Sequence, residues 1–135
     1  MNRLMSLFFI MAAIAPAFAS GQVCAERIDV PKYSPIAVAA QWTGVVDLTV
    51  AVGARGEVVS VEGSAKYPML TEMAKENVKN WVFCAPAKGT SAHIRLRYDY
   101  RLEGAPVYPL PHATVVIDLG TGTIALTSPP MDPQP

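Results

Sequence analysis

The sequence predicts an α+β fold: a three-stranded antiparallel sheet packed by two helices, with an extra C-terminal β-hairpin. Segments 45–52, 57–62 and 92–102 have the apolar spacing of strands with one buried face. The segment 68–81 repeats apolar residues at steps of three and four, which indicates an amphipathic helix. Because a small sheet must bury its apolar side against another layer, we expect the helices on one face of it.

The first half of this fold is a short helix followed by a hairpin. Pro35 suits the first helical position and Ser34 the N-cap, so a helix is expected from residue 35 to residue 41 or 42. Gly44 ends it. Every second residue from 46 to 52 is Val or Leu, and a turn with a glycine at each end, 53–56, joins this strand to 57–62.

The second half is a longer helix and a longer strand. The helix 68–81 begins with a proline, and its apolar face consists of Leu70, Met73, Ala74, Val78 and Trp81. The strand 92–102 has one apolar face, made of Ile94, Leu96, Tyr98, Tyr100 and Leu102. Its other face carries His93, Arg95, Arg97, Asp99 and Arg101. This alternation is typical of an antiparallel strand with one face on the core and one in water.

The C-terminal part is predicted to be an extension of the domain. The domain itself spans residues 20–104, and the extension spans 105–128. Within the extension, short strands at 114–119 and 123–127 flank the turn Gly120-Thr121-Gly122. The proline-rich residues 129–135 are predicted to be a disordered tail.

Residues 1–19 are predicted to be a cleaved signal peptide. Arg3 precedes an apolar run, and Ala17-Phe18-Ala19 matches a signal-peptidase site, which places cleavage between Ala19 and Ser20. The alternative is an uncleaved anchor, although the run is short for a span and Pro16 interrupts it. The protein is therefore expected to be periplasmic or secreted rather than anchored in the inner membrane.

The two cysteines, Cys24 and Cys84, are expected to form a disulfide, because an even count in an exported chain favours pairing. Closing a loop of this length contributes up to about 4 kcal/mol in the chain-entropy treatment. Two free thiols or a metal pair are the alternatives. A metal site needs about four ligands, and only His93 and His112 could join the cysteines, so no metal is expected.

Composition and motifs favour a binding module over an enzyme. The 11 basic and 11 acidic residues balance, which gives no reason to expect nucleic acid as a partner. The sequence has no G-x-S-x-G motif, and no spacing forces two carboxylates together. The segment 118–123 is similar to a phosphate-binding hairpin, but the large domain such loops need is missing. We expect no cofactor, no small-molecule substrate and no pocket that gathers two titratable side chains.

Residues 31–102 resemble the C-terminal domain family of TonB, the periplasmic energy transducer of Gram-negative bacteria. The resemblance rests on an ordered set: Tyr33-Ser34-Pro35 with a short helix, Gly44 and Gly56 with their valine strands, the helix ending at Trp81, Phe83, and the last strand. It implies the predicted fold and a role in binding an envelope or outer-membrane transport protein.

The resemblance also implies where a partner binds. In that family the last strand takes up a short transporter peptide by strand addition. The matching segment is 92–102, so Arg95, Arg97, Tyr98 and Arg101 are the predicted partner-binding residues, and an acidic peptide is the expected ligand. Alternatively, the hairpin 114–127 caps this strand, in which case partners bind weakly or elsewhere.

Other functions remain open from the sequence. A membrane-anchored energy transducer for outer-membrane transport would fit if the N-terminal segment stays in the membrane. A small exported hydrolase or inhibitor is the alternative from a different class. The protein is expected to be a monomer or a strand-exchanged dimer.

Overall fold

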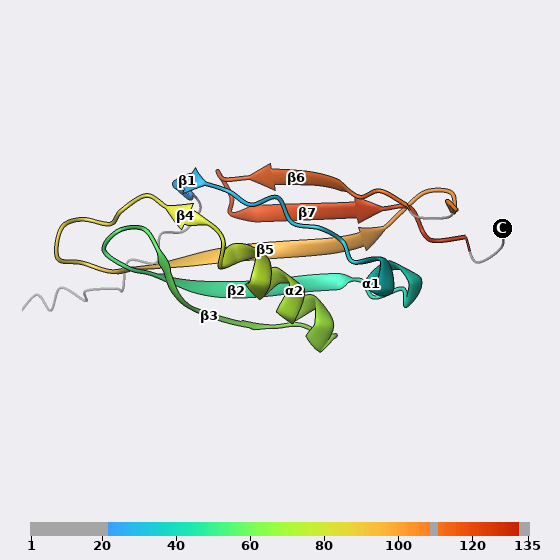
Figure 1. Cartoon of the computed structure of the whole chain (residues 1–135), viewed down its shortest axis with the longest axis horizontal. Helices are drawn as coiled ribbons and strands as arrows, with labels where there is room; N and C mark the ends of the chain where they lie inside the picture. The colour runs from blue at the N-terminus through green and yellow to red at the C-terminus, as the bar shows by residue number, and fades with distance from the viewer. Residues whose placement is uncertain (1–21, 109–110, 133–135) are drawn as a thin grey trace, which may run out of the picture.

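A computed structural model describes residues 22–108 and 111–132. The predicted signal peptide and its cleavage site at Ala19 and Ser20 lie outside these residues. The elements, in chain order, are β1 (Ala25–Arg27), α1 (Pro35–Ala39), β2 (Gly44–Val52), β3 (Val58–Ser64), α2 (Pro68–Val78), β4 (Val82–Phe83), β5 (Ala92–Leu102), β6 (Thr114–Asp118) and β7 (Thr123–Ser128). Figure 1 shows the helices lying across one side of a long sheet. Neither α1 nor α2, the helices of the described ranges, could cross a membrane.

The main sheet has five strands in the order β3-β2-β5-β7-β6, so the prediction of a three-stranded sheet is wrong. The predicted antiparallel strands β3, β2 and β5 are present. The C-terminal hairpin is also present, but it does not stand apart. Its strand β7 pairs with β5 in parallel, from Arg97 opposite Thr123 to Leu102 opposite Ser128. The sheet is therefore a mixed one, extended by the hairpin (Figure 1).

The parallel pairing follows from the route of the chain after β5. β6 begins near the end of β5, because Thr114 lies opposite Thr127 and Thr127 opposite Arg101, and it runs back antiparallel to β5. After the hairpin turn, β7 therefore runs in the direction of β5. Hydrogen bonds hold the segment between β5 and β6 against the chain that follows β7: Glu103 N–H donates to Ser128 O at 2.9 Å, and Val107 N–H to Pro130 O at 2.9 Å. Asp132 N–H in turn donates to Val107 O. Residues 130–132, predicted to belong to a disordered tail, therefore pair with Val107.

The core lies between the sheet and the layer that contains α1 and α2. From the sheet it receives Val46, Leu48, Val50, Val52, Leu96, Tyr98, Tyr100, Ile124 and Leu126. From the other layer it receives Val23, Tyr33, Ala37, Val38, Leu70, Ala74, Val78, Trp81 and Phe83. Most side chains of the predicted apolar faces are thus buried, because they meet each other across this interface, while Met73, Ile94 and Leu102 are partly buried at its rim. Trp81 is buried as predicted, although α2 ends at Val78.

A second, two-stranded sheet, β1 with β4, was not predicted, because its strands are only two or three residues long. The disulfide between Cys24 and Cys84 lies beside it, with Cα atoms 5.3 Å apart, which confirms the predicted pairing. Cys84 N–H also donates to Cys24 O at 2.9 Å. The N-terminal segment is therefore fastened to the chain that leads into β5 by both covalent and hydrogen bonds.

Candidate partner-binding site

The predicted partner-binding residues divide between the two faces of β5. Arg95, Arg97 and Arg101 are exposed on the face turned away from the helices, which we call the open face. Tyr98 is fully buried on the opposite face. Its hydroxyl donates to Asn77 Oδ1 at 2.7 Å, and burial raises its pKa well above the usual value. Tyr98 is therefore a core residue and does not reach a partner on the open face.

Two arginines of the open face, Arg97 and Arg101, pair with neighbouring carboxylates. Arg97 Nε donates to Asp47 Oδ1 on β2 at 2.9 Å. Arg101 Nε donates to Asp99 Oδ2 on its own strand at 2.8 Å. Both side chains of the Arg97–Asp47 pair are more than half exposed, so this pair is screened by water and easily exchanged for another carboxylate.

The outer edge of β5 is partly occupied by the chain's own hairpin. The register with β7 covers Arg97–Leu102, and Arg97 N–H donates to Gly122 O at 2.9 Å. This confirms the alternative that the hairpin caps the strand. Ile124 and Leu126 of β7 are 1% and 0% exposed, so the hairpin belongs to the core. Strand addition along the whole of β5, as predicted, would therefore require a buried strand to leave.

The remaining part of β5 extends past the start of β7. The residues from Ala92 to Leu96 precede the first residue registered with β7, and β2 is the only strand of the described chain that pairs with them. Because Arg97 donates toward β7, alternation along the strand directs the main-chain groups of His93 to the same side. β5 thus keeps a short strand edge beyond the hairpin.

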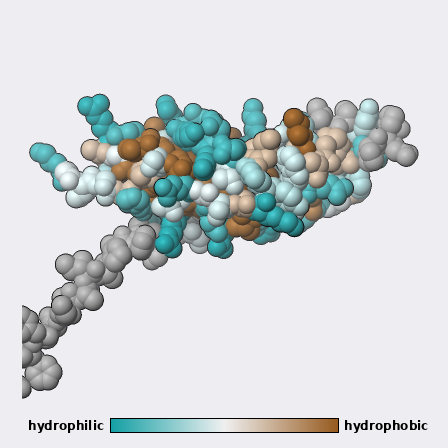
Figure 2. Space-filling model, turned by 90° about the horizontal axis from the view of Figure 1, so that it is seen from below, coloured by the Kyte–Doolittle hydropathy of each residue, from teal (hydrophilic) through white to brown (hydrophobic). Residues whose placement is uncertain are grey.

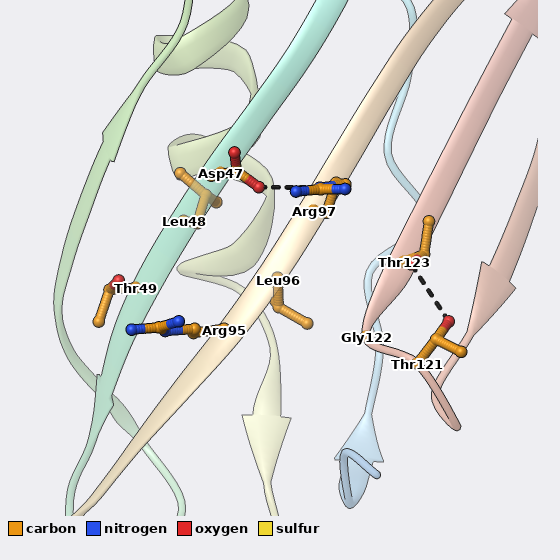
Figure 3. A pocket seen from close by; sticks show the side chains of 9 residues that line it. All are labelled: Asp47, Leu48, Thr49, Arg95, Leu96, Arg97, Thr121, Gly122 and Thr123. Atoms are coloured by element: carbon orange, nitrogen blue, oxygen red, sulfur yellow. Dashed lines mark hydrogen bonds and ion pairs between the residues drawn. The ribbon is translucent and has the colours of Figure 1, made fainter. Parts of the chain in front are cut away.

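A cavity of about 480 Å³ opens at this point, where β7 begins. It is lined by Asp47, Leu48, Thr49, Arg95, Leu96, Arg97, Thr121, Gly122 and Thr123. Figure 3 shows Arg95 and Arg97 extending from β5 toward β2, with Thr121 and Thr123 on the far side of β5. Five of these residues (Asp47, Thr49, Arg95, Arg97 and Thr123) share the open face through the register of β2, β5 and β7.

The β6–β7 turn is shaped so that it can lie against β5. Asp118 Oδ1 accepts the Gly120 N–H at 2.9 Å, and the hydroxyls of Thr121 and Thr123 lie 3.1 Å apart. Gly122 has φ of 70°, and a Cβ there would lie 2.8 Å from Arg95 O. Only glycine fits both requirements without strain. The 118–123 segment is therefore a close-packed turn that forms one wall of the cavity.

The cavity corrects one sequence expectation. It gathers the ionisable side chains of Asp47, Arg95 and Arg97, where no such pocket was expected. Its lining contains no histidine, cysteine or serine, so it offers no evident nucleophile with an adjacent base. Arg101 does not line it. No group of three potential metal ligands occurs among the described residues.

Sequence reasoning found the two arginines but missed Asp47, Thr49, Thr121 and Thr123. Thr121 and Thr123 lie near Arg97 only because β7 pairs in parallel with β5, and no local sequence pattern predicts that pairing. The Gly-Thr-Gly sequence of the turn was a usable signal, because glycine in a hairpin often marks close backbone approach.

Comparison with known proteins places the chain in a family. The sequence pattern described as Gram-negative bacterial TonB protein C-terminal matches residues 29–102, which is more than half of the chain. Comparison with curated proteins and with solved structures gives no significant match. Domains of the matched family are periplasmic and non-enzymatic, and they interact with outer-membrane proteins. The matched segment begins near Asp29 and ends with β5, so β6 and β7 lie beyond it. The chain belongs to the Gram-negative bacterial TonB protein C-terminal family.

Proposed function

We propose that this protein is a periplasmic binding module that takes up a short, acidic, extended segment of an envelope protein at the free end of β5. The observation that carries the proposal is the cavity at the start of β7, which combines two arginines and three threonine hydroxyls beside the part of β5 that does not pair with β7. Membership of a family whose domains bind outer-membrane proteins supports the class of partner.

Charge supports an acidic ligand. Two guanidinium groups and one carboxylate line the cavity, so its lining carries a net positive charge. Arginine forms paired hydrogen bonds with carboxylates, which gives both affinity and orientation. A partner carboxylate would compete with Asp47 for Arg97, an exchange with little cost because the Arg97–Asp47 pair is exposed.

Backbone geometry supports an extended ligand. A segment placed in line with β7, beyond the Gly122 turn that lies against Arg95, would continue the sheet along Ala92–Ile94, and the main-chain groups of His93 point toward that position. The cavity volume, about 480 Å³, lies within the usual range for ligand pockets of about 300–1,000 Å³ and accommodates side chains of such a segment. The resulting contact is small, so we expect weak, salt-sensitive binding.

The test is peptide binding measured by fluorescence polarisation. We expect a labelled peptide of alternating Glu and Val or Thr to bind better than the same peptide with Lys in place of Glu. The double variant Arg95→Glu/Arg97→Glu should lower affinity by at least about tenfold, because each charge reversal replaces attraction by repulsion. Asp47→Asn should raise affinity, because it removes the competing carboxylate.

Arg101→Glu is the matched control. Arg101 has the same side-chain chemistry and lies on the same strand and face, but outside the cavity. Its replacement should leave peptide affinity unchanged. Equal binding of the Glu and Lys peptides, or an equal effect of Arg101→Glu and Arg95→Glu/Arg97→Glu, would refute the proposal.

A further inference from the structure

The structure leaves β6 as an outer strand of the sheet, and its chemistry differs from that of the opposite outer strand. β6 reads Thr-Val-Val-Ile-Asp, with no Lys, Arg or Pro, and its register with β7 is unbroken. Each outer strand carries one carboxylate, Asp118 in β6 and Glu62 in β3, but the pairing of β3 with β2 is irregular near Val52. Bulges protect sheet edges from pairing with other chains, so the regular β6 is the less protected edge.

Apolar side chains lie on both faces of β6. Val116 is 59% exposed on the open face, in the row of Val45, Asp99 and Ala125. Val115 and Ile117 are half-buried on the other face, at the rim of the core. A strand added beside β6 would cover apolar surface on both sides of the sheet. Figure 2 views the molecule from the β3 side, where hydrophilic side chains project between separate apolar patches.

The sequence of β6 fits a second copy of itself. If two β6 strands pair antiparallel about a two-fold axis at Val116, then Val116 faces its own counterpart. Val115 faces Ile117 of the other copy on the core side, and Thr114 faces Asp118. Apolar residues thus meet apolar residues, and the one carboxylate meets a hydroxyl. No like charges are opposed, which is the arrangement that favours cross-strand pairing.

We propose that β6 is a self-association edge through which two copies of this chain join into one continuous ten-stranded sheet. An isologous contact of this kind closes on itself, so association stops at the dimer. A five-residue strand pair buries little surface, well under the roughly 1,200 Å² of a stable complex, so the dimer is weak and forms with rising concentration. The two-fold axis is perpendicular to the sheet, so both open faces lie on the same side.

The first test is the mass of the purified protein by sedimentation equilibrium, from about 10 µM to about 1 mM, the range of weak complexes. We expect the average mass to rise toward that of a dimer. Val116→Lys should weaken association by at least about tenfold, because two ammonium groups would face each other at the axis. Val59→Lys is the control, since Val59 is 66% exposed on the other outer strand.

The second test is cross-linking of Val116→Cys under mild oxidation. Directly opposed residues of antiparallel strands have Cα atoms about 4.5 or 5.5 Å apart, and both distances permit a disulfide. We expect a covalent dimer to form at least about ten times faster than with Val59→Cys, because only position 116 lies on the axis. Both positions are exposed, so the substitutions should leave the fold intact, as the melting temperature would verify.

Three outcomes would overturn the proposal. One is a protein that remains monomeric at the highest concentration. Another is a dimer that Val59→Lys disrupts and Val116→Lys does not, which would place the interface at β3. The third is equal cross-linking of the two cysteine variants, which would indicate random collision.

Discussion

Tyr98 on β5 donates its hydroxyl hydrogen to Oδ1 of Asn77 on α2 at 2.7 Å, which joins the sheet to the helix layer inside the core. Asn77 makes two further bonds there. Its Oδ1 accepts Trp81 Nε1–H at 3.1 Å, and its Nδ2 donates to Asp29 O at 2.8 Å. One side chain therefore holds together three segments that are distant in sequence. Because the network is buried and each member has a partner, removal of its centre is costly.

Asn77→Ala should lower the free energy of unfolding by about 2–4 kcal/mol, because it leaves the Tyr98 hydroxyl without its acceptor in the core. Asn80→Ala is the control. Asn80 Nδ2 also donates to Asp29, to its Oδ2 at 3.2 Å, but Asn80 is exposed, so the loss of its side chain should cost less than about 1 kcal/mol. Urea unfolding of both variants measures the difference. If both variants lost the same free energy of unfolding, the buried hydrogen bonds of Asn77 would contribute no more than the exposed ones of Asn80.

Stability should fall at alkaline pH. Burial raises the pKa of Tyr33 to about 12, and raises those of Tyr98 and Tyr100 further. The unfolded tyrosines lose their protons near pH 10, while the folded ones keep theirs. The contribution of the buried tyrosines to the free energy of unfolding is therefore fully present below about pH 10. It is lost as the pH rises above 10, by up to about 1.4 kcal/mol per pH unit for each tyrosine.

Tyr98→Phe isolates this effect, because it removes one of the most deeply buried titrating hydroxyls. The variant should be less stable than the wild type near neutral pH, by about 1 kcal/mol for the lost hydrogen bond. Its stability should then decline less steeply between about pH 10 and about pH 11. Urea unfolding at several pH values tests this. Parallel declines of the two proteins would mean that Tyr98 does not titrate with unfolding.

Much of the fold could be predicted because its elements carry local patterns. The strict alternation of 92–102 and the proline at position 68 defined β5 and the start of α2 at the observed residues. α2 ends earlier than the apolar repeat suggested, because Trp81 enters the core from the chain after the helix. β1 and β4 are too short for any periodicity to reveal them.

The site was less predictable because it depends on contacts between distant segments. The arginines of β5 were visible as a charged strand face, but their pairing with Asp47 and their position beside Thr121 depend on strand order. The hairpin was predicted as an element, and whether it would cap β5 was left open. The parallel pairing of β7 with β5 shows that the hairpin caps part of β5, and it confines the proposed ligand to the N-terminal end of β5.

The disulfide should stabilise the whole domain. Replacing Cys24 and Cys84 by Ala should lower the free energy of unfolding by up to about 4 kcal/mol, because the unfolded chain regains the freedom of a long loop. The β1–β4 pairs are few, so we expect this small sheet to open first. Hydrogen exchange should then show faster exchange of the Cys84 amide than of the β2 amides. If the Cys84 amide of the variant exchanged as slowly as the β2 amides, the β1–β4 sheet would not be the first part to open.

The hairpin should prove to be part of the folded core rather than a detachable cover. Leu126→Ala should cost about 2–5 kcal/mol, because Leu126 is fully buried on the core face of the sheet. Thr127→Ala, at the adjacent and only half-buried position on the open face, should cost less than about 1 kcal/mol. Thermal unfolding of both variants should remain a single transition, because β7 shares its core with β5. A separate early transition in Leu126→Ala, with the remaining domain unaffected, would instead indicate that the hairpin unfolds independently and exposes the whole edge of β5 to partners.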